Sequence, residues 1–260
     1  MDKKYALLDN YKDYEDRVLV NELLEYAEAC GRSYSLKSTD FLDPRQQKIA
    51  DTILSKCDGI GFEFYGGTEN SERCICMVFS EDYELDDDNL PISILLINWN
   101  ADKKKLTHRD FLGSILGSGI KREKIGDIIL DDGKAYAVCL SDISQYLLYN
   151  LNKVGNTPVT VSIAEELQQK EEKLKTITTT VASLRLDSVI SSGFGISRAK
   201  AVDAIKGGKV KLNWEFVESP SKEVKESDVI SLRGRGRIIL EGVAGTTKKD
   251  REKIVIKKYL

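Results

Sequence analysis

The order of apolar runs between residues 91 and 164 constrains the fold more than any other feature of this chain. Two runs are typical of capped helices, "THRDFLGSILGSGI" and "SDISQYLLYNLNKVG". Four are typical of strands: "PISILLINWN", the two halves of "GDIILDDGKAYAVCL", which Asp-Gly joins as a hairpin, and "TPVTVSIA". The order β-α-β-β-α-β predicts a ferredoxin-like (RRM-like) sandwich, of which the common RNA-recognition fold is one variant.

RNA binding by this middle part is suggested by its topology alone. No strand in it has the aromatic-rich signature that the RNA-recognition fold uses to stack bases. Topology is weak evidence for function, because one fold serves many functions. Whether the middle part contacts RNA or protein therefore stays open.

The rest of the chain predicts an α+β protein with further domains on either side. Residues 1–80 are expected to form two amphipathic helices followed by a small β-hairpin, and an acidic run after them is expected to be a solvated linker. We expect the ferredoxin-like domain over 81–164, a charged linker helix over 165–180, and a domain of two short helices and an antiparallel sheet over 181–260.

Composition favours a soluble cytoplasmic protein. No apolar run reaches the roughly 20 residues of a membrane helix, and the N-terminus lacks the apolar core of a signal peptide. The five cysteines are expected to be reduced, with Cys74 and Cys76 in the core, because no further ligands complete a metal site around them.

Charge is distributed unevenly behind a net value of −3. Residues 1–80 hold 10 Lys and Arg against 15 Asp and Glu, and residues 81–165 hold 9 against 14. Residues 166–260 hold 20 against 13, so the last third is basic. Such asymmetry is typical of a nucleic-acid-binding module, although a solvated basic surface would also produce it.

Three arginines lie close together near the C-terminus, and no carboxylate lies between Val229 and Leu240. In "DVISLRGRGRIIL", Arg233, Arg235 and Arg237 alternate with glycines. If the stretch is one extended strand, the three guanidinium groups share a face. Phosphate is the expected partner, because the arginine fork binds phosphate oxygens in pairs. The alternative is an exposed strand edge protected by charge.

The C-terminal third resembles the RNA-binding domain first described in small-subunit ribosomal protein four. The order and spacing of the pattern are intact over about sixty residues. Its matching positions are Arg185, Leu186, Asp187, Ser197, Arg198, Ala201, Ile205, Gly208, Val210, Asn213, Val217, Pro220, Val224, Asp228 and Ile230. One departure is Trp214, where the pattern usually has glycine after the asparagine.

The chain as a whole resembles the YlmH-type family of bacterial proteins. The resemblance rests on "FLDPRQQ", "LTHRDFLGSILGSGIKREKIGDI" and "VKLNWEFVESPSKEVKESDVISLRGRGR". It implies a factor that binds ribosomal RNA and tRNA on the large ribosomal subunit and helps to handle stalled nascent chains. It also implies an association with cell division.

The expected RNA contacts lie on one basic face of the C-terminal domain. Lysines and arginines at the start of the second helix, at its end and on the following strands would meet phosphate there. Asp187 is expected to orient an arginine or a cap without touching RNA. The expected RNA-binding residues are Arg185, Ser197, Arg198, Lys200, Lys206, Lys209, Lys211, Asn213, Arg233, Arg235 and Arg237.

A catalytic function is the weaker hypothesis. His108 is the only histidine, and it is expected to lie at a helix start. The chain shows no hydrolase elbow and no dinucleotide loop after a strand, so no cofactor, metal or small-molecule substrate is expected. An RNA-modifying enzyme (a pseudouridine synthase or an rRNA methyltransferase) and a protein-binding adaptor remain the alternatives to a non-enzymatic RNA-binding factor.

Overall fold

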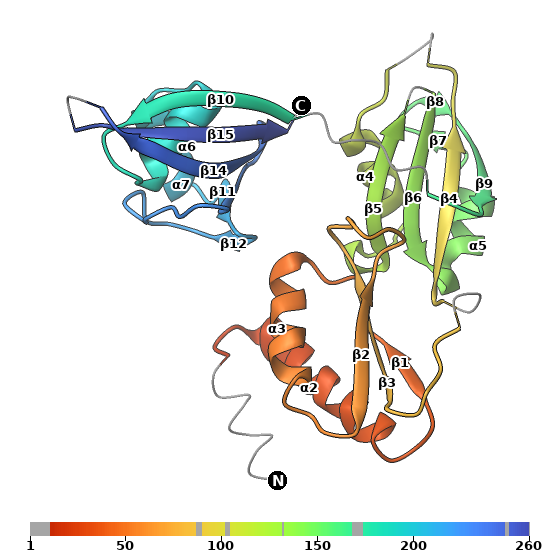
Figure 1. Cartoon of the computed structure of the whole chain (residues 1–260). Helices are drawn as coiled ribbons and strands as arrows, with labels where there is room; N and C mark the ends of the chain where they lie inside the picture. The colour runs from red at the N-terminus through yellow and green to blue at the C-terminus, as the bar shows by residue number, and fades with distance from the viewer. Residues whose placement is uncertain are drawn as a thin grey trace. The chain divides into compact units, whose positions relative to one another are not determined.

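A computed structural model describes residues 11–86, 90–101, 105–131, 133–167, 174–247 and 250–259. The chain divides into two compact units, residues 1–170 and 171–260. Among the described residues, the first unit contains a three-stranded and a four-stranded sheet with their helices and the small β7–β8 pair, and the second contains one sheet and two helices (Figure 1). The fold is α+β, as the sequence predicts.

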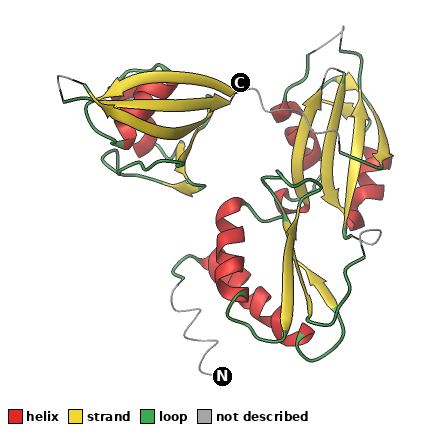
Figure 2. Cartoon of the chain, viewed as in Figure 1, coloured by secondary structure: helices red, strands yellow, loops and turns green. Residues whose placement is uncertain are grey.

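The N-terminal domain consists of two helices packed on a three-stranded antiparallel sheet of order β1-β3-β2 (Figure 2). Its elements are α2 (Tyr14–Cys30), β1 (Leu36–Ser38), α3 (Pro44–Leu54), β2 (Ile60–Tyr65) and β3 (Ile75–Ser80). The expected hairpin is the β2–β3 pair. A capping box starts α3, in which Asp43 accepts the backbone N–H of Gln46 and the Gln46 side chain accepts that of Asp43. Strand β1 was not expected, because three residues are too few to show alternation.

The middle domain has the predicted β-α-β-β-α-β order. Its elements are β4 (Ile92–Asn98), α4 (His108–Gly117), the short 3-10 helix η2 (Arg122–Lys124), β5 (Ile125–Asp131), β6 (Lys134–Leu140), α5 (Ser141–Asn150), β7 (Lys153–Val154), β8 (Thr157–Pro158) and β9 (Thr160–Ala164). The sheet order β5-β6-β4-β9 is antiparallel throughout, which is the ferredoxin-like arrangement. Phe111, Ile115 and Leu147 from the two helices are fully buried against the sheet.

The N-terminal and middle domains share a core within the first unit. Phe41, Ile75 and Met77 of the former pack with Val138 and Leu140 of the latter. The Phe41 ring lies so close to Gly126 that a Cβ added there would meet it at 2.7 Å. The two domains are therefore packed against each other and are not independent domains joined by a linker.

Polar contacts reinforce this joint. Arg73 donates to the carbonyl oxygens of Phe41 at 2.6 Å and Ile125 at 3.2 Å. The Asp127 carboxylate accepts the backbone N–H groups of Glu72 at 2.6 Å and Arg73 at 3.2 Å. Both side chains are half-buried at this seam, and burial lowers the pKa of Arg73 and raises that of Asp127.

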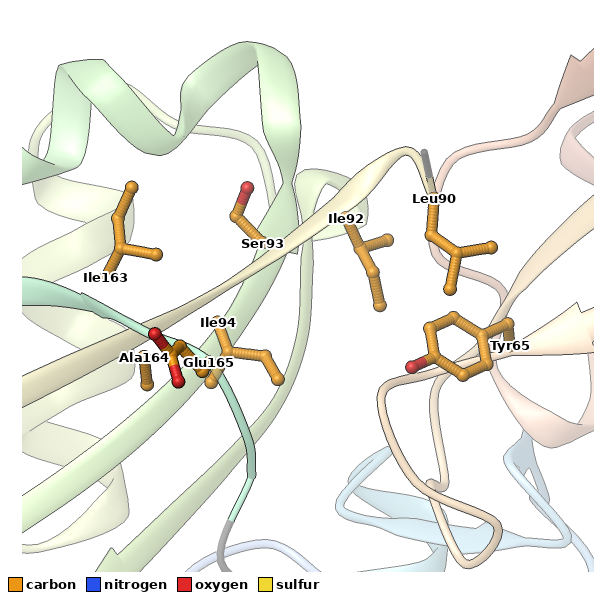
Figure 3. A pocket seen from close by; sticks show the side chains of 8 residues that line it. All are labelled: Tyr65, Leu90, Ile92, Ser93, Ile94, Ile163, Ala164 and Glu165. Atoms are coloured by element: carbon orange, nitrogen blue, oxygen red, sulfur yellow. The ribbon is translucent and has the colours of Figure 1, made fainter. Parts of the chain in front are cut away.

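A pocket of about 220 Å³ opens beside the same joint (Figure 3). Its lining is both polar and apolar and comes from the end of β2, the start of β4 and the end of β9. The lining residues are Tyr65, Leu90, Ile92, Ser93, Ile94, Ile163, Ala164 and Glu165.

The cysteines expected in the core are there. Cys74 and Cys76 are both buried, and burial raises the pKa of the Cys74 thiol to about 11 and that of Cys76 to about 12. Both therefore stay protonated near neutral pH. All five cysteines are free thiols.

The C-terminal domain is a six-stranded antiparallel sheet with two helices on one face (Figure 1). Its elements are β10 (Leu174–Val181), α6 (Leu186–Phe194), α7 (Arg198–Lys206), β11 (Val210–Leu212), β12 (Glu215–Phe216), β13 (Val229–Leu232), β14 (Gly236–Thr246) and β15 (Glu252–Tyr259). The strand order is β10-β15-β14-β13-β11-β12. The helices pack closely on the sheet, because a Cβ on Gly193 would meet Ile238 at 2.5 Å.

Three expectations for this part of the chain are wrong. The linker helix over 165–180 is contradicted at its end, where 174–181 is strand β10 paired with β15, and residues 168–173 lie outside the described ranges. The stretch "KVKLNWEFV", in which the alternation of apolar and polar residues predicts a single strand, is the hairpin β11–β12. The stretch "SDVISLRGRGRII" is likewise two strands, β13 and β14, joined by a turn over residues 233–235.

Within the described residues, no helix is both long and apolar enough to cross a membrane.

Candidate nucleic-acid interface

One buried carboxylate gathers two arginines at the start of both C-terminal helices. Arg185 is the N-cap residue of α6, and Arg198 is the first residue of α7. The Nη2 atoms of both arginines lie 3.1 Å from Asp187 Oδ2, and both Nε atoms also donate to this carboxylate. The Asp187 side chain is only 3% exposed, whereas those of Arg185 and Arg198 are 40% and 54% exposed. Asp187 thus orients two arginines, as expected, and its lack of contact with RNA stays a prediction.

The electrostatics of this cluster fit a charged carboxylate. Burial raises the pKa of Asp187, but the hydrogen bonds from Arg185 and Arg198 outweigh it, so its pKa lies below the usual range. The contact to Asp187 uses two of the five N–H donors of each guanidinium. Two half-exposed cations are thus held in fixed orientation, which suits them to bind an anion.

The second helix places further positive charge beside this pair. Ser197 caps α7, its hydroxyl oxygen accepting the backbone N–H of Lys200 at 3.3 Å. The side chain of Ser197 therefore has a structural task within the domain. Lys200 in the first turn and Lys206 in the last turn are both exposed.

Two turns meet at one end of the sheet and bring more cations together. The backbone N–H of Arg233 donates to the carbonyl oxygen of Lys209 at 2.9 Å, which joins the β13–β14 turn to the end of α7. Gly234 has a φ of 83°, so the turn needs glycine there. Lys209, Arg233 and Arg235 are exposed. We refer to Lys209, Arg233 and Arg235 as the turn cluster.

Asn213 is engaged at both ends of its amide. Its Nδ2 donates to Asp228 at 2.7 Å, and its Oδ1 accepts the backbone N–H of Val229 at 2.9 Å. These bonds fix the β11–β12 turn against β13. Asn213 is thus tied to its own domain in this structure.

The predicted site residues are divided between the two faces of the sheet. Val210 and Leu212 of β11 are buried under the helices, so Lys211 between them points to the opposite face. Arg237 pairs with Ser231, which lies between buried Ile230 and Leu232, and so shares that helix-free face. The expectation that three arginines of one strand line one face is wrong, because two of them lie in a turn.

Sequence reasoning missed the aromatic residues of the helix-free face. The guanidinium carbon of Arg237 is 5.5 Å from the ring centroids of both Trp214 and Tyr259, and Lys211 Nζ is 4.7 Å from that of Phe216. The alternation in "KIVIKKY" contains a signal for Tyr259, because it places Lys253, Lys257 and Tyr259 on one face. In "KVKLNWEFV", alternation alone places Phe216 on the face opposite Lys211, and the hairpin pairing is what brings the two together.

No group of three or more His, Cys, Asp or Glu side chains in the described ranges could hold a metal ion. His108 is the first residue of α4, as predicted. Thr107 before it donates its backbone N–H and its hydroxyl to the Asp110 carboxylate.

Two family models match the chain. One, described as "Putative RNA-binding domain in YlmH", matches residues 86–169, and the S4 domain matches residues 184–230. A relative in Bacillus subtilis (strain 168), named "Ribosome-associated protein quality control protein P2", is 31% identical over 246 residues, which cover 94% of this chain and 95% of that protein. The chain belongs to the YlmH family.

A solved structure titled "Cell division protein ylmH from Streptococcus pneumoniae" is also similar to this YlmH-family chain. It is 25% identical, with a TM-score of 0.49, and the match covers 59% of this chain and 93% of that one. The S4 match includes the Asp187 cluster, α7 and Asn213, but it ends at residue 230. The role of the turn over 233–235 and of Arg237 therefore rests on geometry alone.

Proposed function

We propose that this YlmH-family chain is a non-enzymatic RNA-binding factor of the ribosome. It binds rRNA and tRNA on the large subunit and acts in the handling of stalled nascent chains. The name of the Bacillus subtilis relative supports the ribosomal and quality-control parts of this proposal. The matched domains are RNA-binding domains, which supports binding without catalysis.

The observation that carries the proposal is the positive charge fixed around the two C-terminal helices. Arg185 and Arg198 are aimed by the buried Asp187 carboxylate, and α7 adds exposed lysines beside them. The turn cluster extends this positive charge to the end of the sheet. Rigidly held guanidinium groups recognise phosphate oxygens in pairs, so structured RNA is the ligand that this arrangement fits best.

The contacts to large-subunit rRNA and to tRNA are the finer part of the proposal. A basic surface presented by helices and turns suits the phosphates of a folded RNA better than it suits base edges. The family resemblance also implies an association with cell division. No residue of this site supports that association, which stays an expectation.

Co-sedimentation with ribosomal subunits across a salt series tests the proposal. The wild-type chain should travel with the large subunit at low salt and dissociate as salt rises. The triple variant Lys209→Ala, Arg233→Ala, Arg235→Ala should bind more weakly and lose about 0.9 from the log–log salt slope for each phosphate contact removed.

The matched control is Lys37→Ala, which removes an exposed lysine of β1 in the other unit and should leave binding unchanged. Circular dichroism checks that each variant is folded. Equal binding of the triple variant and the wild type at every salt concentration would contradict the proposal, as would failure of the wild type to bind. Binding that does not respond to salt would favour the protein-adaptor hypothesis.

A further inference from the structure

The helix-free face of the C-terminal sheet has one continuous cross-strand row of aromatic and cationic side chains. Register places Phe216 opposite Lys211, Lys211 opposite Ser231, and Ser231 opposite Arg237. The neighbouring pair Ile238–Lys258 puts Tyr259 beside Arg237. Residues directly opposite in antiparallel strands share a face. We refer to Phe216, Lys211, Ser231, Arg237 and Tyr259 as the aromatic row.

Each ring of this face has a cation next to it, and none of the rings is buried. Phe216 is 66% exposed, with Lys211 Nζ 4.7 Å from its centroid. Arg237 lies 5.5 Å from both Tyr259 and Trp214, and neither ring is buried. An exposed phenylalanine gains little from hydrophobic burial. Its place next to a lysine therefore needs an explanation other than core packing.

Trp214 gives a second, independent observation. It occupies the β11–β12 turn with a φ of 67°, and Asn213 before it has a φ of 49°. A bulky residue is strained there, whereas glycine at this position would be relaxed. Strain of this kind persists where a side chain is needed for function. The side chain retained here extends the aromatic row by lying over Arg237.

We propose that the aromatic row and Trp214 form a second RNA-binding surface, which stacks unpaired bases of a single-stranded segment. Every base has a π-face that can stack on an aromatic ring, and the cations beside the rings match the phosphates of the same strand. This inference rests on the proposed RNA-binding function and adds a ligand class to it. The domain thereby has two working faces, one toward folded RNA and one toward an unpaired strand.

Charge on this face favours a nucleic acid over a protein partner. Lys257 also belongs to it, pairing across the strands with Ile239, and its Nζ lies 2.5 Å from Glu241. Because this ion pair neutralises the Glu241 carboxylate, Glu241 adds no net negative charge that would repel phosphate. An acidic peptide would use the same cations, whereas the unpaired bases of an RNA strand would use both the cations and the flat faces of the rings beside them.

Tryptophan fluorescence of the full-length chain provides the test. The chain has two tryptophans, so Trp99→Phe leaves Trp214 as the single reporter. A single-stranded oligouridylate should quench Trp214 fluorescence, and a blunt RNA duplex of equal length should not. Binding of a labelled oligouridylate, followed by anisotropy, should weaken about 5- to 150-fold in Phe216→Ala and in Trp214→Gly.

Matched substitutions separate stacking from other causes. Phe216→Tyr keeps an aromatic ring and should bind like the wild type, while Phe216→Leu keeps apolar volume and should bind like Phe216→Ala. Trp214→Gly places the strain-free residue in the turn, so a thermal melt should show a folded domain. If Phe216→Leu binds like the wild type, stacking is overturned in favour of a simple apolar contact.

Co-sedimentation of the same variants keeps this inference distinct from the proposed function. One outcome would overturn the second surface and leave the proposed function standing. In it, the wild-type chain binds the large subunit in a salt-dependent way, oligouridylate does not quench Trp214 fluorescence, and Phe216→Ala binds oligouridylate as the wild type does. If oligouridylate binding depends on Phe216 and Trp214 but no subunit is bound, the second surface is supported and the ribosomal function fails.

Discussion

At the scale of single residues, Asp187 organises the side of the C-terminal domain that we propose faces RNA. Its side chain is nearly fully buried, and it accepts two hydrogen bonds from each of two arginines that come from different helices. Asp187 thereby links the start of α6 to the start of α7 and fixes the direction of both guanidinium groups. The residue acts on a ligand only through these arginines, so it is a positioning residue.

The lowered pKa of Asp187 makes its contribution depend on pH. Because the folded state favours the charged carboxylate, the stabilisation is present above the unfolded pKa of about 3.9 and is lost as pH falls through the lower folded value. We expect Asp187→Asn to lower the free energy of unfolding by about 1–3 kcal/mol at neutral pH. The difference from the wild type should shrink below a pH of about 4.

Urea unfolding in the Trp99→Phe background, followed through Trp214 fluorescence, measures this change. Glu241→Gln is the control, because its ion pair with Lys257 is half-exposed and should contribute no more than about 1 kcal/mol. An effect of Asp187→Asn that stays constant from neutral pH to a pH of about 3 would show that the ion pairs are not its cause.

At the scale of elements, two hairpin turns decide which face of the sheet each cation occupies. The β13–β14 turn removes Arg233 and Arg235 from the strands and leaves Arg237 on the helix-free face. The β11–β12 turn brings Trp214 over Arg237 and sets Phe216 opposite Lys211. Both turns use positive φ angles, at Gly234 and at Trp214. The backbone of these turns therefore determines the functional geometry.

A matched pair of glycine substitutions tests the role of backbone conformation. Gly234 has a φ of 83° and no atom within 4 Å of an added Cβ, so Gly234→Ala should destabilise the C-terminal domain by about 1–2 kcal/mol through backbone strain alone. Gly113 lies exposed within α4 and also has free space, so Gly113→Ala should stabilise the middle domain by about 0.5–1 kcal/mol. Differential scanning calorimetry of the full chain measures both.

The two substitutions are expected to change stability in opposite directions, and this difference isolates the effect of backbone conformation. A side chain added at either glycine meets no neighbour, so steric overlap cannot account for a difference between them. If Gly234→Ala leaves stability unchanged, the turn does not need its left-handed conformation. Glycine at position 234 would then not be required for the geometry of the turn cluster.

At the scale of the whole molecule, the first unit is held together by a seam of buried polar and apolar contacts. Arg73 bridges the carbonyl oxygens of Phe41 in the N-terminal domain and Ile125 in the middle domain. The backbone of Phe41 also donates to the carbonyl oxygen of Glu123 at 2.8 Å. The family match over residues 86–169 therefore covers a domain that shares its core with the N-terminal one.

Removal of the Arg73 side chain should loosen this seam. Arg73→Ala leaves the carbonyl oxygen of Phe41 without its charged donor, whereas that of Ile125 keeps Arg122, so the change should cost about 1–3 kcal/mol. Hydrogen exchange of the full chain should then speed up at the amides of Phe41 and Glu72, which bond across the seam. Arg32→Ala is the control, because Arg32 forms only an exposed pair with Glu28. Unchanged exchange at Phe41 in Arg73→Ala would show that apolar packing alone holds the joint.

Much of the fold follows from short-range sequence patterns. The apolar periodicity and the Asp-Gly turn predict the order of the middle domain, and the threonine before "HRDFLGSILG" predicts the start of its first helix. The motif pattern around Asp187 predicts its role, because its partners lie at fixed spacing in the chain. Such features depend on neighbours in sequence, and sequence determines them.

The tertiary structure alone decided the placement of the cations. Alternation predicts a strand through Asn213 and Trp214, because tryptophan rarely adopts a positive φ. It also predicts a strand from Arg233 to Arg237, because glycine tolerates strand and turn conformations alike. Residues 174–181 differ from these segments, because they are rich in threonine and other β-branched residues, which favour a strand, and they pair with β15 along their whole length. The linker helix expected over 165–180 continues the charged pattern of the preceding residues too far. The two faces of the C-terminal sheet become visible only once the strands are paired.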